Sequence, residues 1–203
     1  CVYFRSLATR TAGVVVPDRL DDMITAAKAW GADLVIVETP GIGQGDAAIV
    51  DHVDCALYVM TPEFGAASQL EKIDMLDFAD VVAINKFDRR GGEDALRDVR
   101  RQMVRNSEAF HTSPDEMPVF GTVASRFNDD GVTGLYQELR SRLQSHGLPG
   151  SQVGGVLPRV DTKVSSADTA IVPAARSRYL AEIAADVRAH HATVAEQTAV
   201  ARE

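Results

Sequence analysis

Two apolar runs that each end in a polar cluster constrain this chain most. Residues 33–38 read Asp-Leu-Val-Ile-Val-Glu, and residues 81–88 read Val-Val-Ala-Ile-Asn-Lys-Phe-Asp. A continuous apolar run of this length is typical of a parallel strand that is buried on both faces. Ligands of open α/β sheets bind just beyond the carboxyl ends of such strands. Glu38 and Asp88 are therefore both expected at a binding site.

Strand-like and helical patterns alternate along the chain. Strands are expected near 2–5, 33–38, 55–60, 81–86 and 118–123, and helices near 19–30, 66–79, 92–109 and 131–146. This alternation predicts an α/β fold with a mostly parallel sheet flanked by helices. We expect one domain over residues 1–146. A segment rich in Gly, Ser and Pro, 147–173, is interpreted as a linker. Residues 174–203 contain strong helix formers and predict a C-terminal helix.

The spacing Asn85-Lys86-x-Asp88 resembles the guanine-reading motif of GTPases. Guanine presents adjacent N–H donors that a single carboxylate, here Asp88, can accept together. Adenine lacks this pair, so such a site would reject it by roughly 10⁴-fold. Asn85 can tie neighbouring loops together, and the methylene stem of Lys86 can lie along the base. A backbone N–H of Ala124 or Ser125, after the next strand, could bind the guanine carbonyl oxygen, and the sequence leaves both open.

The first run ends in Glu38-x-x-Gly41, which resembles the Mg²⁺ and γ-phosphate sensor of the same proteins. Glu38 would hold Mg²⁺ through water, because this ion keeps part of its hydration shell. Gly41 would let its backbone N–H approach the γ-phosphate closely. Gln44 is a candidate to orient the attacking water, although it lies three residues past Gly41.

Segment 38–46 carries Glu where most GTPases have Asp, and in this it is similar to the metallochaperone GTPases that serve cobalamin-dependent mutases. Longer segments resemble the fused isobutyryl-CoA mutase branch of the methylmalonyl-CoA mutase family. They are residues 4–10, 57–63, 69–80 and 176–183. In that branch the G-protein chaperone domain lies between a cobalamin-binding domain and an acyl-CoA mutase domain.

The resemblance implies a GTPase that binds GTP and Mg²⁺ and gates adenosylcobalamin loading into the mutase. Adenosylcobalamin would belong to the parent protein and would not be bound by these residues. The cobalamin-binding and mutase domains would be the partners, within a homo-oligomer of the parent. Isobutyryl-CoA and methylmalonyl-CoA both remain compatible as the substrate.

The phosphate-binding motif G-x-x-x-x-G-K-[ST] does not occur in the chain, which starts at Cys1. We therefore expect an internal fragment whose P-loop lies upstream, so that its sheet is incomplete at the N-terminus and the fragment alone is inactive. The alternative is a GTPase that lost its P-loop in evolution.

Composition narrows the function classes. The net charge of −8 argues against nonspecific nucleic-acid binding, and no apolar run reaches membrane-spanning length. The two cysteines suit a reducing cytoplasm. Two other functions stay open, a non-catalytic scaffold between domains and a nickel-insertion GTPase. The lack of a His-rich tract argues against the nickel-insertion GTPase.

Overall fold

The computed structural model describes residues 2–7, 16–39, 47–65, 70, 73–150, 157–166 and 179–202. Its sheet contains three parallel strands in the order β1 (Leu57–Met60), β2 (Val81–Asn85) and β3 (Val119–Thr122). Leu57 lies opposite Val81 in the first pair, and Asn85 lies opposite Thr122 in the second. The parallel sheet and its flanking helices confirm the predicted α/β class. The last register also places the carboxyl ends of β2 and β3 side by side.

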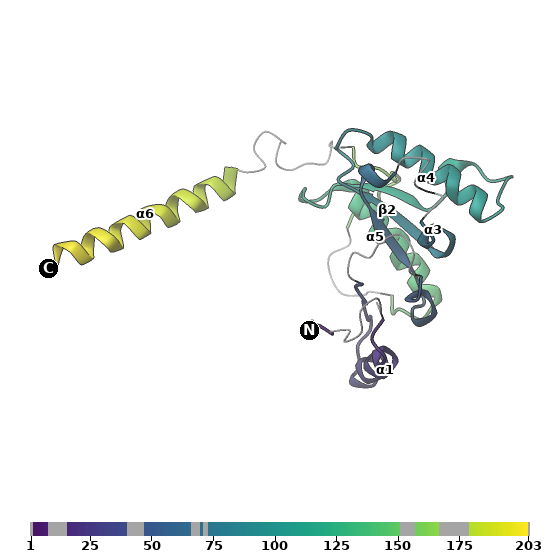
Figure 1. The fold of residues 1–203 in the computed structure, drawn as a ribbon, viewed down its shortest axis with the longest axis horizontal. Helices are drawn as coiled ribbons and strands as arrows, with labels where there is room; N and C mark the ends of the chain where they lie inside the picture. Colours follow the sequence, from purple (N-terminus) through teal and green to yellow (C-terminus); the bar gives the residue numbers. More distant parts are fainter. Residues whose placement is uncertain are drawn as a thin grey trace.

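Helices connect and flank these strands (Figure 1). The α-helices are α1 (Leu20–Trp30), α3 (Met75–Phe78), α4 (Gly92–Asn106), α5 (Asp130–Ser145) and α6 (Tyr179–Ala201). Short 3₁₀ turns in the described residues are η1 (Val50–His52), η2 (Pro62–Phe64) and η3 (Pro114–Glu116).

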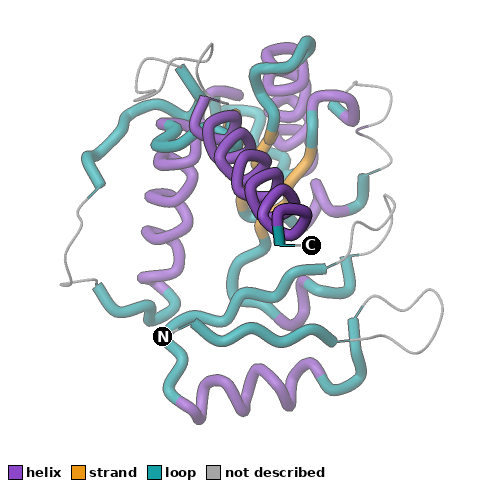
Figure 2. Tube along the Cα trace, turned by 90° about the vertical axis from the view of Figure 1, so that its left-hand side faces the viewer, coloured by secondary structure: helices purple, strands orange, loops and turns teal. Residues whose placement is uncertain are grey.

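The two long helices α4 and α5 cover different faces of the sheet. Val82, Ile84 and Val119 share a buried cluster with Val99 of α4. Phe120, the next residue along β3, faces the other way, and its ring lies near Gly134 of α5. Strand β2 is therefore buried on both faces, as its continuous apolar run predicts. Figure 2 shows the strands between helices of the main body.

Residues 157–166, which we call the strap, lie against α5 and reach the outer edge of β3. An isolated parallel bridge joins Gly121 to Val164 of the strap. Composition alone does not reveal this docking within the predicted linker, because the strap is held by contacts that are distant in sequence. The opposite edge belongs to β1, whose Leu57 and Val59 are 37% and 56% exposed.

Two of the expected strands do not form. Residues 2–7 and 34–39 have no regular secondary structure, and Phe4 and Ile36 are 83% and 82% exposed. An apolar run becomes a strand only when a neighbour completes its hydrogen-bond ladder, and no described residue does so here. The ring of Tyr3 lies instead 6.2 Å from that of Trp30, at the end of α1.

The C-terminal helix α6 projects away from the body of the molecule (Figure 1). Its apolar residues Ile183, Val187 and Val194 are between 42% and 48% exposed. Within the described part of the chain, no helix has the length and apolar character needed to cross a membrane.

Candidate functional site

A hydrogen bond ties the end of β2 to the loop that follows β3. The side-chain Oδ1 of Asn85 accepts from the backbone N–H of Ala124 at 3.1 Å. The two residues are 39 positions apart in sequence, and the parallel register of β2 and β3 brings them together. The structure thus contains the loop-tying contact that the amide of Asn85 was expected to make.

The chain turns sharply after Asn85. Lys86 adopts φ +57°, in the left-handed region that residues with a side chain enter rarely. The N–H of Phe87 donates to Thr122 O at 3.0 Å, and the N–H of Arg89 donates to Lys86 O at 3.0 Å. This turn carries Asp88 beyond the end of the sheet, while the exposed Lys86 side chain remains in solvent.

The carboxylate of Asp88 is partly open to solvent, with its side chain 45% exposed. Arg126 is its cationic neighbour, with Nη2 lying 3.7 Å from Asp88 Oδ2. A carboxylate has two oxygens, and in its ionised form both only accept hydrogen bonds. Asp88 is therefore able to accept two donors from one ligand edge.

Asp129 holds the loop after β3 from inside the molecule. It is buried, and its Oδ2 accepts from the N–H of Val123 at 3.2 Å and from the N–H of Val132 at 2.9 Å. The second bond is an N-cap for helix α5, a role that Asp fills well. One carboxylate thus fixes both the loop and the helix start.

A second ion pair reaches this region from η2. Arg89 Nη1 donates to Glu63 Oε1 at 2.9 Å. The Thr61 hydroxyl, the backbone and the Arg89 guanidinium together lower the pKa of Glu63 to about 2. The pair connects the segment after β1 to the turn after β2.

The other predicted site residues are placed as follows. Ser125 is exposed, and within the described residues its N–H has no hydrogen-bond partner. Glu38 lies on a segment without regular structure, so it does not end a strand as predicted. Gly41 and Gln44 lie outside the described residues. No three His, Cys, Asp or Glu side chains in the described ranges are grouped closely enough to hold a metal ion by themselves.

Sequence reasoning missed Arg126 and Asp129. Asp129 had a usable signal, because an Asp just before a helical pattern is a common N-cap. Arg126 had none, because its contact with Asp88 depends on how the two loops meet in space.

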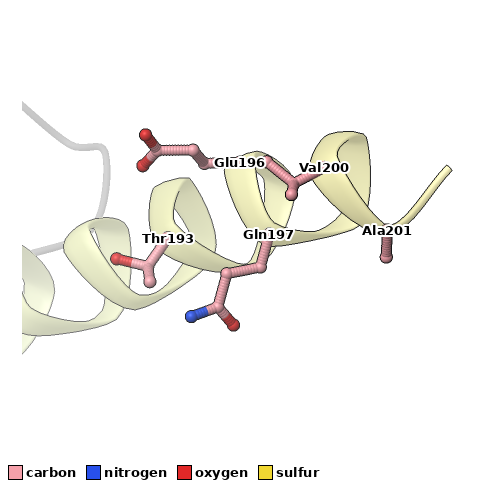
Figure 3. Close-up of a pocket in the computed structure, with 5 residues that line it drawn as sticks. All are labelled: Thr193, Glu196, Gln197, Val200 and Ala201. Carbon is pink, nitrogen blue, oxygen red and sulfur yellow. The ribbon is translucent and has the colours of Figure 1, made fainter. Parts of the chain in front are cut away.

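An open hollow lies elsewhere, along α6 (Figure 3). Its lining residues all belong to that one helix. They are Thr193, Glu196, Gln197, Val200 and Ala201. The hollow therefore includes none of the residues at the carboxyl ends of β2 and β3.

A parallel sheet between helices, with an Asn-Lys-x-Asp turn at the carboxyl end of its central strand, defines a P-loop GTPase-like α/β fold. Comparison with known families agrees with this class. The chain belongs to the MeaB family, described as methylmalonyl Co-A mutase-associated GTPase, whose sequence profile matches residues 1–201.

Similar proteins are larger fusions. The chain is 67% identical over 201 residues to a fused isobutyryl-CoA mutase of Nocardia farcinica, covering 99% of this chain and 18% of that protein. It is 61% identical over 202 residues to a fused isobutyryl-CoA mutase of Cupriavidus metallidurans, covering 100% and 18%. The corresponding protein of Geobacillus kaustophilus is 46% identical over 204 residues, covering 99% and 18%. The chain thus spans 18% of the length of each of these relatives.

Proposed function

We propose that this chain is the base-reading part of a GTP-binding and GTP-hydrolysing chaperone domain that gates adenosylcobalamin loading into an acyl-CoA mutase. The observation that carries the proposal is the Asn85–Ala124 hydrogen bond, which joins two loops beside the open carboxylate of Asp88. This arrangement offers an acceptor and backbone donors at one end of a parallel sheet, where a nucleotide base would bind.

A guanine base would fit the hydrogen-bonding groups at this end of the sheet. Asp88 would accept the two adjacent N–H donors of guanine, and Lys86 would lie against the base face. The N–H of Ala124 already donates to Asn85, so the N–H of Ser125 is the better donor to the guanine carbonyl oxygen. We therefore assign that contact to Ser125 and the loop-tying role to Ala124.

The metal site would be completed by the nucleotide itself. Mg²⁺ usually takes one or two protein carboxylates and fills its other positions with phosphate oxygens and water, so Glu38 is a suitable ligand. Gly41 would contact the γ-phosphate, and Gln44 would orient water. When bound, GTP and Mg²⁺ would supply the γ-phosphate whose hydrolysis switches the domain. The β- and γ-phosphates would need a cradle that no motif in these 203 residues provides.

The partners would be the mutase and cobalamin-binding domains of a longer homo-oligomeric parent in the cytoplasm. The names of the fused relatives support this assignment, and the exposed apolar residues of α6 leave a helix that could pack against another domain. Isobutyryl-CoA and methylmalonyl-CoA remain alternative substrates of that parent.

A non-catalytic scaffold is the second candidate, favoured by the absence of a phosphate-binding motif from the sequence. GTP turnover by the intact protein distinguishes the two. The chaperone proposal expects measurable turnover that falls at subsaturating GTP when Asp88 is changed to Asn. Turnover that is absent, or that is indifferent to Asp88, would favour the scaffold.

A further inference from the structure

The strap docks on β3 through one isolated parallel bridge, between Gly121 and Val164. The N–H of Gly121 donates to Lys163 O at 2.9 Å, and the N–H of Ser165 donates to Gly121 O at 2.9 Å. Lys163 Nζ also donates to the carbonyls of Asp115, Glu116 and Met117, at 2.9 to 3.0 Å. The strap is thus anchored at the start of β3 as well as along it.

Helix α5 is shaped to admit the strap. A Cβ on Gly131 would lie 2.8 Å from Ser165 N, and a Cβ on Gly134 would lie 2.5 Å from Thr162 O. Any larger residue at either position would push the strap away. These close approaches indicate that the surface of α5 is adapted to pack against the strap.

One strap side chain contacts the base-reading region by two routes. The Ser165 hydroxyl donates to Oδ1 of Asp129, whose other oxygen accepts the N–H of Val123. The same hydroxyl accepts from Arg126 Nη1 at 3.5 Å, and Nη2 of Arg126 faces Asp88 at 3.7 Å. Ser165 is therefore connected to the loop backbone through Asp129, and to the carboxylate that would read the base through Arg126.

We propose that Ser165 is a positioning residue of the base site, which couples docking of the strap to binding of a guanine base. The proposal rests on the proposed function. The hydroxyl gives buried Asp129 a third hydrogen bond and holds Arg126 beside Asp88. An ordered strap therefore presets the loop that carries the Ser125 N–H. Because coupling between two sites is reciprocal, a bound guanine base stabilises the docked strap by the same factor.

The test uses the intact protein and the variants Ser165→Ala, Ser165→Thr and Ser145→Ala. Ser165→Thr keeps the hydroxyl. Ser145 is the matched control, because its exposed hydroxyl bonds Arg142 O at the far end of α5. Two quantities are measured. The first is the affinity for GDP relative to the affinity for ADP, and the second is the hydrogen-exchange rate of the Gly121 and Ser165 amides with and without GDP.

Loss of a hydrogen bond to a buried carboxylate should weaken GDP binding in Ser165→Ala by about tenfold or more. GDP should slow exchange of the two amides in the wild type and much less in Ser165→Ala, while Ser165→Thr and Ser145→Ala behave like the wild type. If Ser165→Ala speeds exchange but keeps wild-type GDP affinity, the coupling is overturned while the proposed function stands. A wild type that binds GDP and ADP equally would overturn the proposed function and the coupling with it.

Discussion

Lys86 shows how a single residue sets the geometry of the candidate base site. Its φ of +57° is a conformation that costs about 1–3 kcal/mol for a residue with a side chain. The hydrogen bond from Phe87 N–H to Thr122 O extends the β2–β3 pairing past Asn85 and holds this turn in place. The unfavourable backbone is therefore maintained by the sheet, and it directs Asp88 beyond the strand end.

At the same scale, Glu63 gives a prediction of how the stability of the fold depends on pH. Its pKa of about 2 means that the ionised form is favoured in the folded protein over the unfolded chain. The stabilisation is thus fully present above the ordinary glutamate pKa, and it is lost as the pH falls toward 2. A side-chain NMR titration should give this pKa for Glu63, with an upward shift in Thr61→Val and in Arg89→Met. A wild-type titration at the ordinary value of 4.5 would contradict the Thr61 and Arg89 contacts.

At the scale of elements, the packing of β3, α5 and the strap predicts that a substitution of Gly131 strongly lowers the stability of the fold. An added Cβ there would lie 2.2 Å from Gly121 O, which is backbone and cannot rotate away. Gly131→Ala should therefore lower the free energy of unfolding by about 2–3 kcal/mol. Gly150→Ala is the matched control, since its Cβ would meet nothing within 4 Å. Denaturant unfolding measures both, and equal stabilities would contradict the close packing of α5 on β3 and the strap.

The elements that sequence predicts well are those whose pattern is local. Strand β2 was predicted from its apolar run, and α4 (Gly92–Asn106) from its helical periodicity. Leu70, Ile73 and Leu76 recur at helical spacing in the sequence, and all three are buried.

Elements that depend on distant partners were not predictable in the same way. The run at 33–38 has strand composition, yet no described neighbour pairs with it. The strap has linker composition, yet Ser165 bonds a residue 36 positions away and Lys163 bonds one 46 positions away. Within the candidate site, the Asn-Lys-x-Asp turn was visible in sequence, whereas the Arg126–Asp88 pair came only from the meeting of two loops.

At the scale of the whole molecule, we expect the 203-residue chain on its own to have little GTP-binding or GTP-hydrolysing activity. It holds groups for the base but no G-x-x-x-x-G-K-[ST] cradle for the phosphates, which carry most of the nucleotide's charge. We expect residues 1–203 alone to bind GTP weakly or not at all and to show no measurable hydrolysis. Calorimetry with GTP and Mg²⁺ and a phosphate-release assay measure this, with a longer form of the protein as the comparison. Micromolar binding with turnover by the 203-residue chain would show that it contains its own phosphate site.

The central claim is that Asp88 reads guanine, and competition binding of GTP, XTP and ATP to the intact protein tests it most directly. The wild type should prefer GTP over ATP by roughly 10⁴-fold, since adenine cannot supply two donors to the carboxylate. Asp88→Asn presents one acceptor and one donor, which match xanthine better than guanine. It should lower GTP affinity by about 100-fold and raise XTP affinity. An unchanged preference for GTP in Asp88→Asn would contradict the assignment.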